Sequence, residues 1–204
     1  MHLSRKELDE LNSIYKINFV NSITGYKPAN LIATKSKEGI SNVAVFSSVV
    51  HLGSAPPVLG FILRPTTVPR HTYSNIKETG YYTINHIHKA IIEDAHHSSA
   101  KYPEGVSEFD KTTLEEEYLG DFFAPYVKDC PVKIGLKYLE EYQIKSNNTI
   151  FVLGEIMEVY VEDHLIEKNG LINLTKGGTA AINGLDTYAV PETNKQLEYQ
   201  RPKK

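Results

Sequence analysis

Two long β-prone segments dominate the second half of the sequence. They cover residues 132–144 and 149–161, and the dipeptide Asn147-Asn148 lies between them. A connection this short joins antiparallel strands, because parallel strands need a crossover of a dozen or more residues. The sequence therefore predicts a long antiparallel hairpin, and it shows no βαβ rhythm that would indicate an α/β fold.

The rest of the chain adds shorter strands with helices between them. Strands are expected at 29–35, 41–49, 58–63 and 81–87, and helices at 5–15, 69–79 and 89–100. Residues 52–57 are a predicted loop, since two prolines cannot feed a central ladder, and the charged stretch 101–127 is expected to run over the surface. The pattern predicts a mainly β fold, an antiparallel Greek-key barrel with peripheral helices.

Length and charge narrow the class of protein further. The 204 residues favour one domain, 1–204, with a polar tail from about residue 189. The net charge of −3 argues against a nucleic-acid partner, which usually meets a clearly basic surface. Cys130 is the single cysteine, so no internal disulfide can form. With no secretory signal and no apolar run of about 18 residues, we expect a cytoplasmic protein that does not engage a membrane.

Polar residues gather at the ends of two strands and at one helix start. They are Ser47 and Ser48 after the strand core at 41–49, Arg64, Thr66 and Thr67 after the strand at 58–63, and Arg70, His71, Thr72 and Asn75 at the start of the helix at 69–79. Hydroxyls, an arginine and a helix N-terminus suit a bound phosphate or another anion. Plainer roles stay open at this point: Ser47 and Ser48 also fit a strand end that satisfies backbone groups, and Arg64 fits an ordinary surface arginine.

Motifs for metal binding and for nucleophilic catalysis are weak. His96 and His97 are adjacent and point about 100° apart on a helix. His86 and His88 share one face of a strand, but no carboxylate or cysteine set stands at metal-ligand spacing. Neither candidate serine lies in a G-x-S-x-G motif. We therefore expect no metal and identify no catalytic residue, and composition and spacing alone do not name a reaction.

Several segments together resemble the flavin reductase-like family of FMN-binding split barrels. They are residues 39–48, the double proline at 56–57 with 58–61, Arg64-Pro65, residues 71–76 and 80–85, Cys130-Pro131-Val132 and residues 149–156. The resemblance covers roughly residues 20–185 and implies a split β-barrel. It also implies a homodimer with one FMN per subunit near the subunit interface, in which the flavin carries the chemistry.

The resemblance also implies roles for individual residues. Ser47 and Ser48 would contact the flavin ring or ribityl chain, and Asn85 would lie near the cofactor. The phosphate would be surrounded by Arg64, Thr66, Thr67, Arg70, His71, Thr72 and Asn75.

The family implies an oxidoreductase that passes hydride from NAD(P)H, as co-substrate, through FMN to a small or flavin acceptor. Many members carry a histidine at the turn before the late Gly-Glu strand, where this chain has Asn147 and Asn148. A flavoredoxin-like electron carrier without its own nicotinamide site is therefore the alternative. A barrel that binds a nucleic acid or another polyanion is a third hypothesis, and the acidic balance argues against it.

Overall fold

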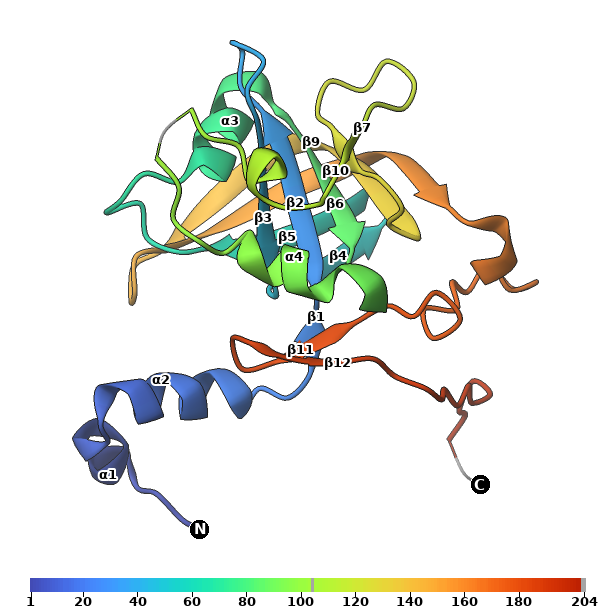
Figure 1. The fold of residues 1–204 in the computed structure, drawn as a ribbon. Helices are drawn as coiled ribbons and strands as arrows, with labels where there is room; N and C mark the ends of the chain where they lie inside the picture. The colour runs from blue at the N-terminus through green and yellow to red at the C-terminus, as the bar shows by residue number, and fades with distance from the viewer. Residues whose placement is uncertain (104, 203–204) are drawn as a thin grey trace.

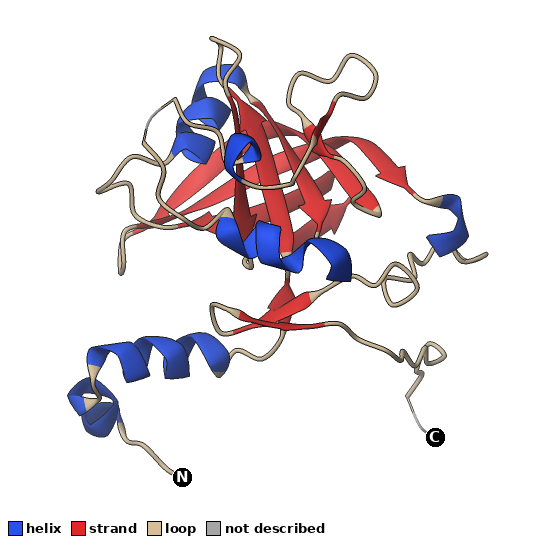
Figure 2. Cartoon of the chain, in the orientation of Figure 1, coloured by secondary structure: helices blue, strands red, loops and turns tan. Residues whose placement is uncertain are grey.

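A computed structural model, which describes residues 1–103 and 105–202, is built around one seven-stranded antiparallel sheet (Figure 1). The strand order is β3-β2-β6-β9-β10-β5-β4. These strands are β2 (Asn30–Lys35), β3 (Ser41–Phe46), β4 (Val50–Ser54), β5 (Pro57–Leu63), β6 (Tyr81–His86), β9 (Val132–Ile144) and β10 (Thr149–Val161). The sheet curls around an interior, as the strands in Figure 2 show. The prediction of a mainly β, antiparallel architecture is confirmed.

Two small sheets and several helices surround this barrel. The small strands are β1 (Lys27–Pro28), β11 (Ala181–Asn183) and β12 (Thr187–Ala189) in one sheet, and β7 (Glu116–Glu117) and β8 (Tyr126–Val127) in the other. The helices are α1 (Arg5–Glu10), α2 (Ser13–Ser22), α3 (His71–Thr79) and α4 (Ile92–His97), with the 3-10 turns η1 (Lys89–Ile91), η2 (Phe109–Lys111) and η3 (Asp163–Leu165). In the described ranges, no helix combines the length and apolar character that a membrane span needs.

The β9–β10 hairpin forms as predicted, with both strands at the expected bounds. Asn148 takes the left-handed backbone conformation at the turn, with φ 59°, which asparagine tolerates better than most residues. The pairing shifts register twice, between Leu153 and Gly154 and again near Met157. Such irregularities bend and twist a strand, so they help the long hairpin to follow the curve of the barrel.

Residues 52–57 are not the predicted loop. Val50–Ser54 forms β4, which pairs with β5 in a hairpin whose turn contains Ala55 and Pro56. The prediction was wrong because it placed the double proline against a central ladder. β4 is at the edge of the sheet, and Pro57 is the first residue of β5, positions at which proline is accepted.

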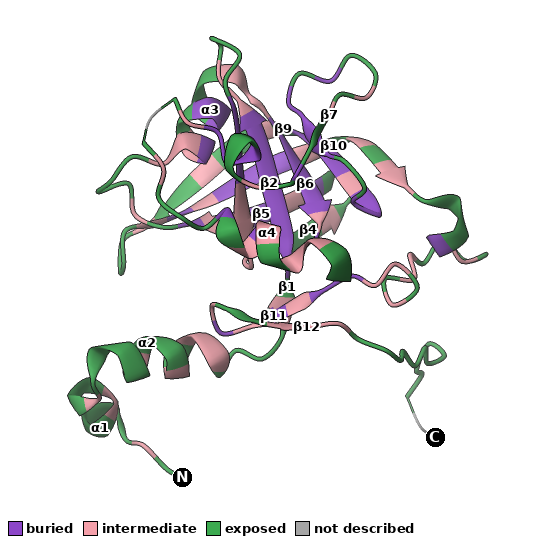
Figure 3. Cartoon of the chain, viewed as in Figure 1, coloured by how far each residue is buried: buried purple, intermediate pink, exposed green. Residues whose placement is uncertain are grey.

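The helices follow the predicted pattern except at the N-terminus. α3 ends at Gly80, which adopts φ 78° as the expected C-terminal glycine. The helix expected at 5–15 is instead two helices, because Asn12 begins a new one by accepting a hydrogen bond from the Ile14 N–H at 3.0 Å. Neither α1 nor α2 contains a buried residue, and Figure 3 shows both extending away from the barrel.

The core occupies both faces of the sheet. On β2, Ile32 packs into the barrel interior, whereas its neighbours Leu31 and Ala33 face the outer layer. This alternation follows from the two-residue period of a strand. The outer layer includes α4 and part of the segment 105–127.

The segment 101–127 was expected to lie on the surface, and this prediction was wrong for much of it. Phe109, Leu114, Phe122 and Tyr126 are buried. Their spacing in the sequence has no helical or strand period, so the many charged residues between them concealed their contribution to the core. Glu104 lies outside the described residues.

Candidate functional site

Ser47 and Ser48 lie half-buried where the chain leaves β3 for β4. The Ser48 hydroxyl donates to the Ile62 carbonyl at 3.0 Å and accepts from the Ile62 N–H at 3.1 Å. Because Ile62 belongs to β5, this one hydroxyl fastens the end of β3 to a strand distant in the sheet. Ser48 thus fills the plainer role of satisfying backbone groups. The Ser47 hydroxyl has no protein partner within the described ranges.

The loop between β5 and α3 carries the exposed polar groups of the site. The side chains of Arg64, Thr66 and Thr67 are exposed, and they make no ion pair or hydrogen bond within residues 1–103 and 105–202. Arg70 is half-buried, and its Nε donates to the Pro65 carbonyl at 3.4 Å, which ties the two ends of the loop together. One guanidinium and two hydroxyls are therefore left for an external partner.

The N-terminus of α3 adjoins this loop and has no side-chain cap. Arg70 occupies the N-cap position without a capping hydrogen bond, whereas Ser4 caps α1 and Asn12 caps α2. The first N–H groups of a helix lack partners inside the helix and carry partial positive charge. At α3 these groups, including those of His71 and Thr72, are available to an anion.

Thr72 and Asn75 hold α3 against the sheet through their side chains. The Asn42 amide donates to the Thr72 hydroxyl, and the Asn75 amide donates to the Thr34 hydroxyl, both at 3.0 Å. All four residues are buried. These bonds position the helix, and the Thr72 hydroxyl, which only accepts from Asn42, keeps its own proton to donate. The phosphate contacts of Thr72 and Asn75 stay predictions.

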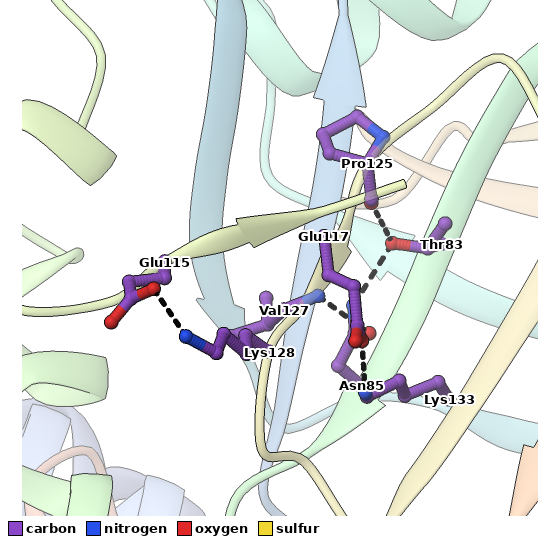
Figure 4. A network of polar contacts seen from close by, with 8 residues as sticks. All are labelled: Thr83, Asn85, Glu115, Glu117, Pro125, Val127, Lys128 and Lys133. Atoms are coloured by element: carbon purple, nitrogen blue, oxygen red, sulfur yellow. Dashed lines mark hydrogen bonds and ion pairs between the residues drawn. The ribbon is translucent and has the colours of Figure 1, made fainter. Parts of the chain in front are cut away.

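Asn85 has a structural role in the described chain, and its place beside a cofactor stays a prediction. Its amide nitrogen donates to the Thr83 hydroxyl at 2.9 Å, and its oxygen accepts from the Val127 N–H at 3.0 Å (Figure 4). The amide nitrogen also donates to the Leu31 carbonyl at 3.3 Å. Thr83 in turn donates to the Pro125 carbonyl. The bond from the Val127 N–H fastens β8 to β6, and the Asn85 side chain is fully buried.

Glu108 is a residue near the site that sequence reasoning missed. It is 5% exposed, and its Oε2 accepts a hydrogen bond from the Val43 N–H at 3.1 Å on the free edge of β3. Burial raises the pKa of Glu108, and backbone hydrogen bonds, including the one from the Val43 N–H, oppose that shift together with the nearby His71. The residue lies in the charged stretch 101–127, where no spacing in the sequence distinguishes it from its solvated neighbours.

The histidines considered as metal ligands do not gather. His96 Nδ1 lies 3.3 Å from the Tyr188 hydroxyl, and His97 Nε2 lies 2.7 Å from the Tyr102 hydroxyl. In the part of the chain that the structure describes, no group of three or more His, Cys, Asp or Glu side chains is placed to hold a metal ion. The candidate site is the group of polar side chains and backbone N–H groups around the start of α3.

The structure thus combines an antiparallel barrel with hydrogen-bond donors at a strand end and at a helix N-terminus, an arrangement that suits an anion. The model of the flavin reductase like domain matches residues 26–179 of this chain. The chain belongs to this family.

Solved structures agree with this assignment. A protein from Shewanella frigidimarina, named as a flavin reductase with a split barrel domain, is 44% identical, with a TM-score of 0.95 over 98% of this chain and 100% of its own. Nitrilotriacetate monooxygenase component B from Bacillus cereus is 18% identical, with a TM-score of 0.82 over 98% of both chains. Flavoredoxin from Desulfovibrio vulgaris is 24% identical, with a TM-score of 0.72 over 86% of this chain and 91% of its own. The predicted split-barrel fold is confirmed.

Proposed function

We propose that this chain is an FMN-binding oxidoreductase that passes hydride or electrons from NAD(P)H through FMN to a small or flavin acceptor. The observation that carries the proposal is the uncapped N-terminus of α3 beside the side chains of Arg64, Thr66 and Thr67, which have no partner among the described residues, in a chain of the flavin reductase like family. When bound, FMN supplies a ring system that accepts and releases hydride.

The residues of the site would hold and orient this cofactor. The first-turn N–H groups of α3 and the Arg64 guanidinium neutralise the phosphate, and the hydroxyls of Thr66 and Thr67 add hydrogen bonds to its oxygens. Arg70 and His71 surround the same group, and Arg70 also keeps the loop closed through Pro65. Ser47 is left to contact the ring or the ribityl chain. Because the flavin carries the chemistry, this role needs no acid–base pair from the protein.

A flavoredoxin-like electron carrier without its own nicotinamide site is the second candidate. The turn at which many family members have a histidine carries Asn147 and Asn148 in this chain. The Asn147 carboxamide oxygen accepts hydrogen bonds from the Thr149 N–H at 3.1 Å and from its hydroxyl at 2.7 Å. It is therefore used to form the turn, and this observation favours a chain that receives electrons from a protein donor.

We also propose a homodimer in which a second copy covers α2. Ile14, Ile17, Val20 and Ile23 of this region are between 44% and 70% exposed, an unusual run of apolar surface on a helix that contacts no core.

Cys130 is buried, which raises the pKa of its thiol to about 12 and makes it unreactive. A single inert cysteine is consistent with a reducing cytoplasmic location.

Flavin absorbance tests whether the chain binds FMN, and the rate of NAD(P)H oxidation separates the two candidate functions. Under both, the purified protein binds FMN in a near-stoichiometric amount and shows flavin absorbance. Steady oxidation of NADH or NADPH with added FMN selects the reductase, and reduction only by dithionite or a protein donor selects the carrier. Protein that takes up no FMN contradicts both.

The dimer is tested by sedimentation of the parent and of Ile17→Glu. The parent should sediment as a dimer, and the charged variant should shift toward monomer because a buried carboxylate at an apolar contact is unfavourable. Lys16→Glu provides the matched control, since Lys16 pairs with Asp9 at 2.9 Å within the same chain. A monomeric parent, or a variant that dimerises as the parent does, contradicts this arrangement.

A further inference from the structure

The free edge of β3 is held by one buried carboxyl group, that of Glu108. β3 is the first strand in the sheet order and pairs only with β2, so its other edge has no neighbouring strand. There the Val43 N–H donates to Glu108 Oε2 at 3.1 Å. Phe109, the first residue of η2, is buried in the outer layer together with Val43. The carboxyl group therefore takes the place of a neighbouring strand at this position of the edge.

The part of β3 that Glu108 holds is also the part that holds the start of α3. Asn42, the residue before Val43, donates through its side-chain amide to the Thr72 hydroxyl at 3.0 Å. Thr72 is the second residue of α3, and His71 is the first. The charge of a protonated His71 acts on the Glu108 carboxyl group, although the two side chains form no hydrogen bond or ion pair within the described residues. Glu108 is thus linked to the first turn of α3 both through β3 and through its charge.

Few charged groups act on the Glu108 carboxyl group. β3 contributes no ionisable side chain. α3 contributes His71 at its start, next to the N-cap residue Arg70, whereas Lys77 and Glu78 lie in its second half. His71 is the charged group of the described residues whose field shifts the pKa of Glu108. The ionisable side chains of α4 and η2 are exposed or bonded elsewhere: Glu93, Asp110 and Lys111 face solvent, and Asp94, His96 and His97 bond to Thr113, Tyr188 and Tyr102.

The hydrogen bond of Glu108 survives a change in its charge. Burial raises the pKa of Glu108 above its ordinary 4.5, so the carboxyl group ionises at a higher pH than a solvated glutamate does. A neutral carboxyl group still accepts through its carbonyl oxygen, so the Val43 N–H keeps a partner in both states. Ionisation therefore changes the charge beside the first turn of α3 and leaves the contact in place. A negative charge there opposes any second negative charge bound to that turn.

We propose that Glu108 is a positioning residue whose charge sets how tightly the start of α3 binds a phosphate. In either charge state the carboxyl group keeps the edge of β3 in place, and with it Asn42 and the first turn of α3. When the carboxyl group ionises, its negative charge weakens phosphate binding without any contact between Glu108 and the ligand. The inference rests on the proposed function only in taking the phosphate to be that of FMN. The contribution of Glu108 therefore favours FMN binding at low pH and FMN release as the pH rises.

Glu108→Gln tests the proposal, because glutamine keeps an acceptor oxygen for the Val43 N–H and cannot ionise. Quenching of flavin fluorescence gives the dissociation constants of FMN and riboflavin for the full chain at each pH. At about pH 8 the variant should bind FMN about three- to tenfold more tightly than the parent, the effect of one charge roughly 10 Å from another. The difference should vanish as the pH falls toward 4.5. Riboflavin, which has no phosphate, should bind both proteins alike.

Glu158→Gln is the matched control, because it removes the same charge from a distant part of the chain. Glu158 accepts hydrogen bonds from the hydroxyls of Tyr126 at 3.3 Å and Tyr160 at 3.0 Å. It lies toward the end of β10 opposite to Ile150, which pairs with Leu63 beside the candidate site. The control should bind FMN and riboflavin as the parent does at every pH.

Inorganic phosphate provides a readout that does not depend on flavin. It should shift the amide NMR signals of His71 and Thr72, and at about pH 8 it should do so at a lower concentration in Glu108→Gln than in the parent. Equal affinities of the two proteins for FMN and phosphate at that pH, or an equal change for FMN and riboflavin, overturns the proposal.

The two ligands also separate this proposal from the proposed function. Phosphate binding without FMN binding removes the proposed function and leaves the role of Glu108. FMN binding that Glu108→Gln does not change removes only the role of Glu108. A chain that binds neither ligand contradicts both.

Discussion

Replacing Arg64 by alanine separates the phosphate contact from all other contacts of the flavin. The Arg64 side chain is exposed and has no ion pair within the described residues, so the change should alter the free energy of unfolding by no more than about 0.5 kcal/mol. A hydrogen bond to a charged group contributes about 1.5–3 kcal/mol, and solvent exposure favours the lower end of this range. A loss of about 1.5 kcal/mol weakens FMN binding roughly tenfold. Riboflavin lacks the phosphate and should bind as it does to the parent.

Quenching of flavin fluorescence gives both dissociation constants for the parent, Arg64→Ala and a control. Arg5→Ala is the matched control, because Arg5 is an exposed arginine of α1 that pairs with Asp9 at 3.1 Å. Added salt should narrow the preference for FMN over riboflavin in the parent and the control, and much less in Arg64→Ala, since salt screens exposed charges. An equal loss for both ligands, or a loss of FMN in the control, would refute the placement of the phosphate.

Three further predictions concern stability, each measured by urea unfolding. Asn85→Ala should lower the free energy of unfolding by about 2–3 kcal/mol, because it leaves buried partners unpaired, and a loss near zero would contradict its role in fastening β8. Burial raises the pKa of Glu108 above its ordinary 4.5. Glu108 should thus contribute fully to the free energy of unfolding below pH 4.5, and this contribution should fall as the pH rises through the folded-state pKa. In Glu108→Gln the free energy of unfolding should lack this dependence on pH. Gly154→Ala should cost about 1–3 kcal/mol because its Cβ would collide with the Tyr82 hydroxyl, whereas Gly53→Ala should cost less, since its nearest contact is 3.4 Å away.

The predictable elements of the fold are those whose sequence pattern alone, such as a turn dipeptide or a helix-ending glycine, matches the position that they take in the folded chain. β9 and β10 each span 13 residues around an Asn-Asn turn, and their bounds could be predicted to the residue. Gly80 correctly indicated the end of α3. β4 could not be predicted, because whether Pro56-Pro57 breaks a strand depends on that strand being at a sheet edge, which only the assembled sheet decides.

The candidate site was predictable as a group of polar residues and not as a set of contacts. The partners of Ser48, Thr72 and Asn75 lie 14, 30 and 41 residues away in the sequence. A residue type indicates that a side chain can form hydrogen bonds, but the partner is set by the packing of α3 and β5. Arg64 was expected at a rim because it follows a buried strand, and its side chain is exposed there.

A crystal structure of the protein grown with FMN tests the central claim most directly. The phosphate should lie within hydrogen-bond distance of the first-turn N–H groups of α3 and of the Arg64 guanidinium, with the ribityl chain extending toward Ser47. A flavin bound elsewhere on the barrel, with the start of α3 facing only solvent, would contradict the account.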